Sequence, residues 1–149
     1  MATVTGNRIT LNPREMPSRW YNVEADLPFR VPPMMSLSGY PITARELEPL
    51  FPKLIIEQEL NAKNRTFNIP KEVKEAYQQW RPTPMFRAAA LEKELGTPAR
   101  LYYKVEGGSP SGSYESNTAI PQAFYTKKTG ADGIVTGGAG GVWISAIGH

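Results

Sequence analysis

The chain has 149 residues, a formal net charge of +3 and 40% hydrophobic residues. This length allows one ordinary domain, and the composition fits neither a disordered chain nor a membrane protein. There is no cysteine and a single histidine, His149. Disulfide frameworks, thiol nucleophiles and cysteine-bound metal are therefore excluded, and a histidine triad or a two-histidine zinc site is nearly so.

The charged residues give no sign of a polyanionic partner. Lys127-Lys128 is the only Lys/Arg doublet, whereas nucleic-acid binding needs a clustered basic stripe. No apolar run approaches the roughly 18 residues of a spanning helix, and residues 1–12 lack the basic-then-apolar layout of a signal peptide. We expect no nucleic-acid partner, no membrane association, no metal and a cytoplasmic location.

The N-terminal third is rich in proline. More than half of the 14 prolines lie before residue 53. Residues 16–21 and 27–33 cannot be helix interiors, because proline lacks the backbone donor and restricts the residue before it. We predict an extended, turn-rich arm that wraps over a body, with Trp20, Tyr21 and Phe29 as apolar anchors.

Short helices are predicted after the arm. Thr43 and Glu46 have the spacing of a capping box, and Pro52 and Pro70 suit the first turns of helices. Gly96 suits the left-handed residue that ends a helix. The expected helices begin at residue 43 and cover about 52–63, 70–80 and 87–95.

From residue 100 the pattern changes to strand, loop and helix. Strands are expected at 100–106 and 132–136, and helices at about 114–129 and from residue 142. Alternating strands and helices favour an α/β fold with a parallel sheet and flanking helices. We therefore assign residues 1–80 to a Pro-rich arm with short helices, and residues 81–149 to the start of an α/β domain that is incomplete in this chain.

Several blocks together resemble the tryptophan synthase beta-chain family, in its second, more divergent branch. The blocks are Glu15-Met16-Pro17-Ser18-Arg19-Trp20-Tyr21-Asn22, Leu47-Glu48-Pro49-Leu50-Phe51-Pro52, Arg81-Pro82-Thr83-Pro84, Tyr102-Tyr103-Lys104-Val105-Glu106-Gly107, Ser109-Pro110-Ser111-Gly112-Ser113, Asn117-Thr118-Ala119-Ile120-Pro121 and Ser145-Ala146-Ile147-Gly148. The resemblance covers nearly the whole chain, but only the N-terminal part of such an enzyme.

The resemblance implies a pyridoxal-phosphate (PLP) enzyme, a lyase of tryptophan biosynthesis that joins L-serine to indole, with a possible homodimer. In the family, a Ser-His-Lys-x-Asn segment holds PLP as a Schiff base on its lysine. A Thr-Glu-Thr-Gly-Ala-Gly-Gln segment supplies a working carboxylate and a pocket for the substrate carboxylate. The implied fold is the PLP-dependent tryptophan synthase β-like fold.

The first of these segments departs from the family. It reads Ser113-Tyr114-Glu115-Ser116-Asn117, in which Ser113 and Asn117 match, Tyr114 replaces the histidine and Glu115 replaces the Schiff-base lysine. The resemblance makes Ser113, Tyr114 and Asn117 the cofactor-binding candidates and Glu115 the catalytic position. A carboxylate cannot condense with an aldehyde, so Glu115 is not expected to function and covalent attachment of PLP is doubtful.

Other interpretations of these residues come from their positions alone. An acidic residue just after a serine N-cap stabilises the start of a helix, and we favour this role for Glu115. Tyr114 then packs as an aromatic, and Asn117 is either a pocket residue or an exposed helix residue. Lys104 lies inside a predicted strand and Lys127 near the far end of the helix, so neither is an obvious substitute amine.

The second segment departs as well. Alignment without gaps on Trp143 places Gly137 at the family's carboxylate, whereas a slip of one residue places Thr136 there, so the glutamate is absent either way. A glycine loop before a helix offers backbone N–H groups to an anion. The candidate substrate-carboxylate loop is Gly138, Ala139, Gly140 and Gly141. The alternative is a flexible connector.

These departures set the functional expectation. We expect a tryptophan synthase β-type, PLP-dependent lyase by family, truncated and catalytically inactive or very weak, because the lysine and the carboxylate are missing and the family's phosphate-binding loop comes later in the chain. The alternative is a non-catalytic relative or fragment that acts as an anion-binding, cofactor-binding or oligomerisation module.

Overall fold

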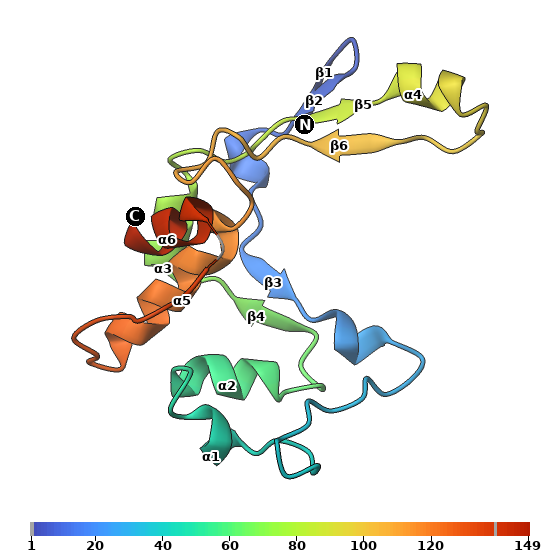
Figure 1. Ribbon diagram of the computed structural model, residues 1–149. Coiled ribbons are helices and arrows are strands. Elements are labelled where there is room, and N and C mark those ends of the chain that lie inside the picture. Colours follow the sequence, from blue (N-terminus) through green and yellow to red (C-terminus); the bar gives the residue numbers. More distant parts are fainter. Residues whose placement is uncertain (1, 139) are drawn as a thin grey trace.

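A computed structural model describes residues 2–138 and 140–149. The strands are β1 (Thr3–Thr5), β2 (Arg8–Thr10), β3 (Arg19–Tyr21), β4 (Thr66–Asn68), β5 (Met85–Arg87) and β6 (Tyr102–Lys104). The α-helices are α1 (Ala44–Leu47), α2 (Lys53–Glu59), α3 (Lys71–Tyr77), α4 (Ala89–Glu94), α5 (Ser116–Lys128) and α6 (Gly141–Gly148). Short 3-10 turns cover Pro13–Glu15 and Val23–Asp26. The fold is mixed α/β (Figure 1).

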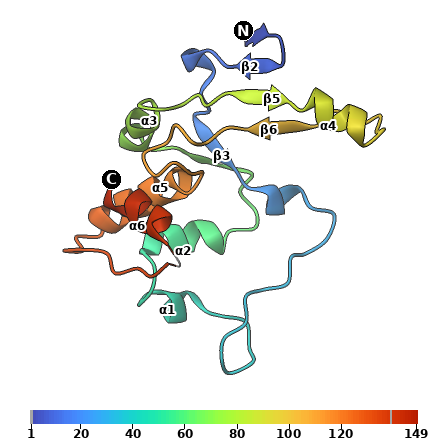
Figure 2. The ribbon, with the colours of Figure 1, turned by 45° about the horizontal axis from the view of Figure 1, so that its top comes forward.

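The strands form two antiparallel sheets. One has the order β1-β2-β5-β6, and the other pairs β3 with β4. In the larger sheet Phe86 lies opposite Tyr103, and their rings stack with centroids 5.6 Å apart. Figure 2 shows β5, β6 and α4 extending away from α2, α5 and α6, which lie together. The larger sheet therefore adds a separate layer beside the helices.

The expected parallel pairing is not confirmed, because every strand pair in the described residues is antiparallel. The strand predicted over residues 132–136 is wrong: those residues form no ladder in the structure. A strand is stable only when a neighbouring strand satisfies its backbone groups and covers its apolar side chains. Val135 instead is fully exposed, at 103% of its reference area. The branched residues alone did not make this segment a strand.

The core lies where the arm meets α3 and α5. Ile69, Val73 and Tyr77 are each at most 3% exposed. The partly buried side chains packed against them are Met16, Trp20, Trp80, Ile120 and Phe124. Trp20 therefore anchors the arm as predicted.

Two other predicted anchors are wrong. Tyr21 and Phe29 are 58% and 63% exposed. Tyr21 lies beside Trp20 on β3, where successive side chains point to opposite faces, so only one of the two can reach the core. The hydroxyl of Tyr21 donates to the Asp26 carboxylate, which also forms an ion pair with Arg65 at 2.7 Å.

The predicted helix ends are largely confirmed. Thr43 and Glu46 form both hydrogen bonds of the capping box at α1. Pro52 and Pro70 are the residues directly before α2 and α3. Gly96 follows α4 with φ of +57°, the left-handed conformation that its position was expected to need.

Two features cross the expected boundary at residue 80. Strand β2 pairs with β5, and α3 packs against α5. The division into residues 1–80 and 81–149 stays a prediction.

Helix α5 runs unbroken through Pro121. None of the helices in the described residues has the length and apolar character needed to cross a bilayer.

Candidate functional site

A serine-rich turn positions the start of α5. The N–H of Ser113 donates to Ser109 Oγ at 2.9 Å, and Ser109 Oγ donates back to the Ser113 carbonyl. Ser111 Oγ lies 2.7 Å from Oγ of the fully buried Ser116. These bonds fix the turn from both sides. The resemblance to the family pointed to Ser113 but missed the roles of the other serines, whose clustering just before the predicted helix was the available signal.

Glu115 is the last residue before α5 and has helical backbone angles. Ser113 Oγ accepts a hydrogen bond from the Glu115 N–H at 3.3 Å, so the serine does cap this turn. The Glu115 carbonyl accepts from the N–H groups of Thr118 and Ala119. Its side chain makes no capping hydrogen bond, and its Oε2 is buried without a hydrogen-bond partner in the described residues. Glu115 therefore does not cap α5 through its side chain.

Asn117 joins a small polar network. Its Nδ2 donates to Glu106 Oε2 at 3.3 Å, and Thr83 Oγ1 donates to Glu106 Oε1 at 2.8 Å. The Lys104 ammonium donates to the Thr83 backbone carbonyl. Burial lowers the pKa of Lys104, and Arg81 adds to this effect, whereas Glu106 opposes it. The network connects Lys104 to Asn117, which is half-buried; Asn117 Oδ1 is buried and unpaired in the described residues.

The residues at the start of α5 do not fit covalent attachment of PLP. Attachment needs an amine, and the amine of Lys104 is engaged by the Thr83 carbonyl. Lys127 lies in the last turn of α5, at the opposite end from Glu115. The two unpaired buried atoms nearest this position, on Glu115 and Asn117, are both hydrogen-bond acceptors. Acceptors repel the phosphate and phenolate oxygens of the cofactor instead of holding them.

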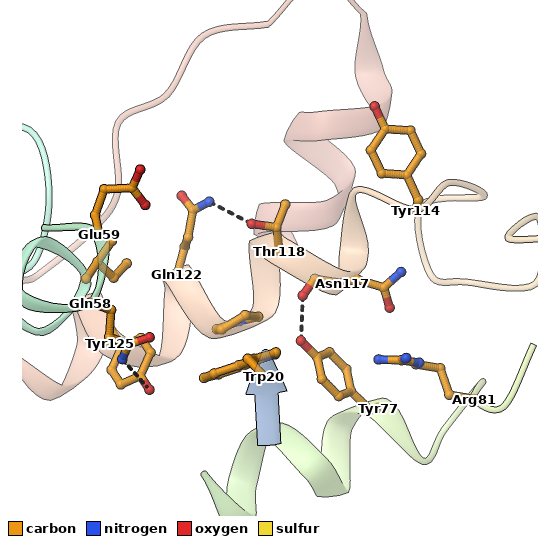
Figure 3. A pocket seen from close by; sticks show the side chains of 12 residues that line it. Trp20, Gln58, Glu59, Tyr77, Arg81, Tyr114, Asn117, Thr118, Gln122 and Tyr125 are labelled. Atoms are coloured by element: carbon orange, nitrogen blue, oxygen red, sulfur yellow. Dashed lines mark hydrogen bonds between the residues drawn. The ribbon is translucent and has the colours of Figure 1, made fainter. Parts of the chain in front are cut away.

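A cavity of about 660 Å³ opens between β3, α2, α3 and α5 (Figure 3). Its lining residues are Trp20, Ile55, Gln58, Glu59, Tyr77, Arg81, Tyr114, Asn117, Thr118, Pro121, Gln122 and Tyr125. Two of the predicted cofactor-binding residues, Tyr114 and Asn117, therefore reach a cavity. Ser113 and Glu115 do not line it. Tyr114 is 68% exposed, so it does not serve as the packing aromatic that its sequence position suggested.

The glycine loop lies at a different cavity. Gly137 lines a space of about 320 Å³, together with Trp143 and Gln122. The Trp143 Nε1–H donates to Thr136 Oγ1 at 2.7 Å. Tyr114 and Asn117 line only the larger cavity, and Gly137 lines only the smaller one. The two predicted segments therefore do not share a cavity, although Gln122 borders both.

The candidate loop leads directly into α6. Gly140 precedes the helix with φ of +137°, and Gly141 is its first residue. A Cβ atom on Gly138 would lie 3.5 Å from Cβ of Trp143, which is ordinary contact. Ala139 lies outside the described residues. The glycine loop therefore leads into a helix, as the sequence predicted.

Comparison with known proteins shows which proteins the chain is similar to. The chain is 48% identical over 141 residues to tryptophan synthase beta chain 2 of Methanosarcina acetivorans, which covers 94% of this chain and 32% of that relative. It is 46% identical over 142 residues to tryptophan synthase beta chain 2 of Thermotoga maritima, covering 95% and 33%. The tryptophan synthase beta chain of Pseudothermotoga lettingae is 48% identical over 141 residues, covering 94% and 33%. No protein-family model matches the chain.

These matches run through almost all of the chain, at a level of identity that chance does not produce. The chain spans about a third of the length of these curated relatives. The chain therefore matches an N-terminal portion of tryptophan synthase beta chains.

Proposed function

We propose that this chain is a member of the tryptophan synthase beta-chain family that does not itself join L-serine to indole by the family's PLP-dependent route. One observation carries the proposal. The position of the family's Schiff-base lysine holds Glu115, whose Oε2 is buried at the start of α5 without a hydrogen-bond partner in the described residues. A carboxylate there cannot form the covalent link on which the route depends.

The proposal can be tested by supplying the missing amine. The purified full chain and its Glu115→Lys variant are mixed with PLP, reduced with borohydride and mapped by peptide mass spectrometry. Glu94→Lys is the matched control, because it makes the same charge change at an exposed residue of α4. We expect no adduct in the unchanged chain, an adduct at residue 115 in the Glu115→Lys variant, and none at residue 94.

Two results would contradict the proposal. One is an adduct on a single lysine of the unchanged chain together with turnover of L-serine and indole. The other is labelling of the two variants to the same extent, since the position of Glu115 would then confer nothing. Circular dichroism of each variant shows whether α5 is kept.

The finer features of the family belong to the same proposal. We propose that this segment forms the first part of a PLP-dependent β-like fold. The identity of 46–48% to tryptophan synthase beta chains over almost all of this segment supports this. Association as a homodimer and the cytoplasmic location stay predictions.

A second candidate function is that of a binding module without turnover. The observation in its favour is the 660 Å³ cavity, which is larger and more aromatic than the space at the glycine loop. Binding of a ligand in this cavity does not require Glu115, because Glu115 does not line it.

A further inference from the structure

The large cavity has aromatic walls contributed by three parts of the chain. Trp20 comes from β3, Tyr77 from α3 and Tyr125 from α5. The rings of Trp20 and Tyr125 have centroids 6.4 Å apart and are tilted by 56°. The two rings therefore contact each other and form one wall, against which a further planar ring can pack. The walls therefore favour a flat, apolar guest.

Arg81 brings a positive charge to one end of this cavity. Its backbone N–H donates to the carbonyl of Tyr77, the last residue of α3, at 2.9 Å, and this bond holds Arg81 close to the end of that helix. Its guanidinium carbon lies 4.8 Å from the centroid of the Tyr77 ring. Figure 3 shows the group beside Tyr77, on the side of Asn117.

The Arg81 guanidinium is without an anionic partner. The ion pairs of the described residues involve other cations, and no hydrogen bond of the Arg81 side chain is formed there. The residue is half-buried, so its charge is less screened than that of a fully exposed arginine. The guanidinium lies over the Tyr77 ring and forms no side-chain hydrogen bond in the described residues, so its N–H groups can bind a carboxylate through two parallel hydrogen bonds.

The other charge at the cavity fixes which guest fits. Glu59 lies at the opposite end of the lining from Arg81 (Figure 3). In an α-amino acid the ammonium and carboxylate groups sit on one carbon, so they cannot reach both ends at once. A guest with one negative charge at the Arg81 end and an uncharged ring elsewhere meets no such conflict.

We propose that this cavity binds a planar aromatic carboxylate, with its carboxylate on Arg81 and its ring packed against the wall of Trp20, Tyr77 and Tyr125. This site is separate from the attachment position at Glu115, which does not line the cavity. The inference rests on the second candidate function proposed above, and its success or failure is independent of whether residue 115 can hold PLP.

The test uses 1-naphthoate as the probe and isothermal titration calorimetry of the full chain as the measurement. The uncharged 1-naphthamide, nearly the same in shape, reports the contribution of the charge. Arg81→Gln removes the proposed partner. Arg100→Gln is the matched control, because it removes the same charge from an exposed arginine that does not line the cavity.

We expect saturable binding of one 1-naphthoate per chain. Binding should weaken about tenfold or more in Arg81→Gln and for 1-naphthamide, since a charge-assisted pair is lost in each. Arg100→Gln should bind within about twofold of the unchanged chain. Circular dichroism shows whether the variants keep their helices.

Three results would overturn the proposal. They are the absence of saturable binding to the unchanged chain, equal affinity for the acid and its amide, and equal weakening by the two arginine substitutions. The third would show that 1-naphthoate responds only to net charge. A Trp20→Leu variant that binds 1-naphthoate as tightly as the unchanged chain would also count against the aromatic walls.

Discussion

The hydroxyl of Tyr77 donates a hydrogen bond to a backbone carbonyl of α5 that has no N–H partner within α5. In an α-helix the carbonyl of residue 117 accepts from the N–H of residue 121. Residue 121 is a proline and has no N–H. Tyr77, from α3, donates its hydroxyl to the Asn117 carbonyl at 2.5 Å. We therefore predict that Tyr77→Phe destabilises the fold by leaving this carbonyl unpaired.

The size of the effect follows from burial. Tyr77 is 1% exposed and belongs to the core, and phenylalanine keeps its ring. The loss is then the hydrogen bond plus the desolvated carbonyl left behind, about 1–3 kcal/mol. With a urea dependence of roughly 1–3 kcal/mol per M, the unfolding midpoint falls on the order of 1 M.

A second substitution isolates the cause. Pro121→Ala restores an N–H at the position that can serve the Asn117 carbonyl within α5. In that background Tyr77→Phe should cost about 1 kcal/mol less, and the double-mutant cycle measures the difference. The assay is urea unfolding followed by circular dichroism at 222 nm. Tyr102→Phe is the control, because Tyr102 is 44% exposed and its hydroxyl has no hydrogen bond in the described residues.

Equal costs of Tyr77→Phe in the two backgrounds would refute this reasoning. Such a result would mean that the carbonyl is satisfied by solvent once the hydroxyl is gone. A cost in Tyr102→Phe as large as that in Tyr77→Phe would show that the assay reports loss of any tyrosine hydroxyl.

Three further predictions concern stability and are measured by the same unfolding assay. Burial raises the pKa of Tyr77 above its ordinary value of 10.0, so the unfolded chain loses this proton first. The unfolding free energy should be steady below that value and fall as pH rises through it, and Tyr77→Phe should remove this part of the decline. Val73→Ala should cost about 2 kcal/mol, because it deletes two methyl groups from a side chain that is 1% exposed. Gly96→Ala should cost about 1 kcal/mol through its φ of +57°, although nothing lies within 4 Å of the added Cβ, and Gly107→Ala at ordinary φ should cost less.

The family and the altered attachment position could both be recognised from the residues. The blocks around residues 81–107 and 109–121 are linear patterns, and linear patterns survive in sequence comparison. The replacement of the lysine by Glu115 can likewise be read from a single position of the sequence. What the sequence did not show was the surroundings of Glu115, because the serines that fix its turn and the buried state of Oε2 depend on packing.

The strands were the least predictable part of the fold. Strands β1 to β5 are each three residues long and carry too little alternation to be recognised. The segment with clear branched residues after α5, residues 132–136, pairs with no strand in the part of the chain that the structure describes. The 660 Å³ cavity was also beyond sequence reasoning, since its residues come from β3, α2, α3 and α5.

The local geometry could be read from the residues: the capping box at Thr43 and Glu46, the helix starts after Pro52 and Pro70, and the left-handed end at Gly96. These features depend on backbone angles and on hydrogen bonds between residues a few positions apart. Which groups meet across the chain depends instead on how the helices and strands pack. Tyr77 and Asn117 lie 40 residues apart, and their hydrogen bond exists because α3 and α5 pack together around one core.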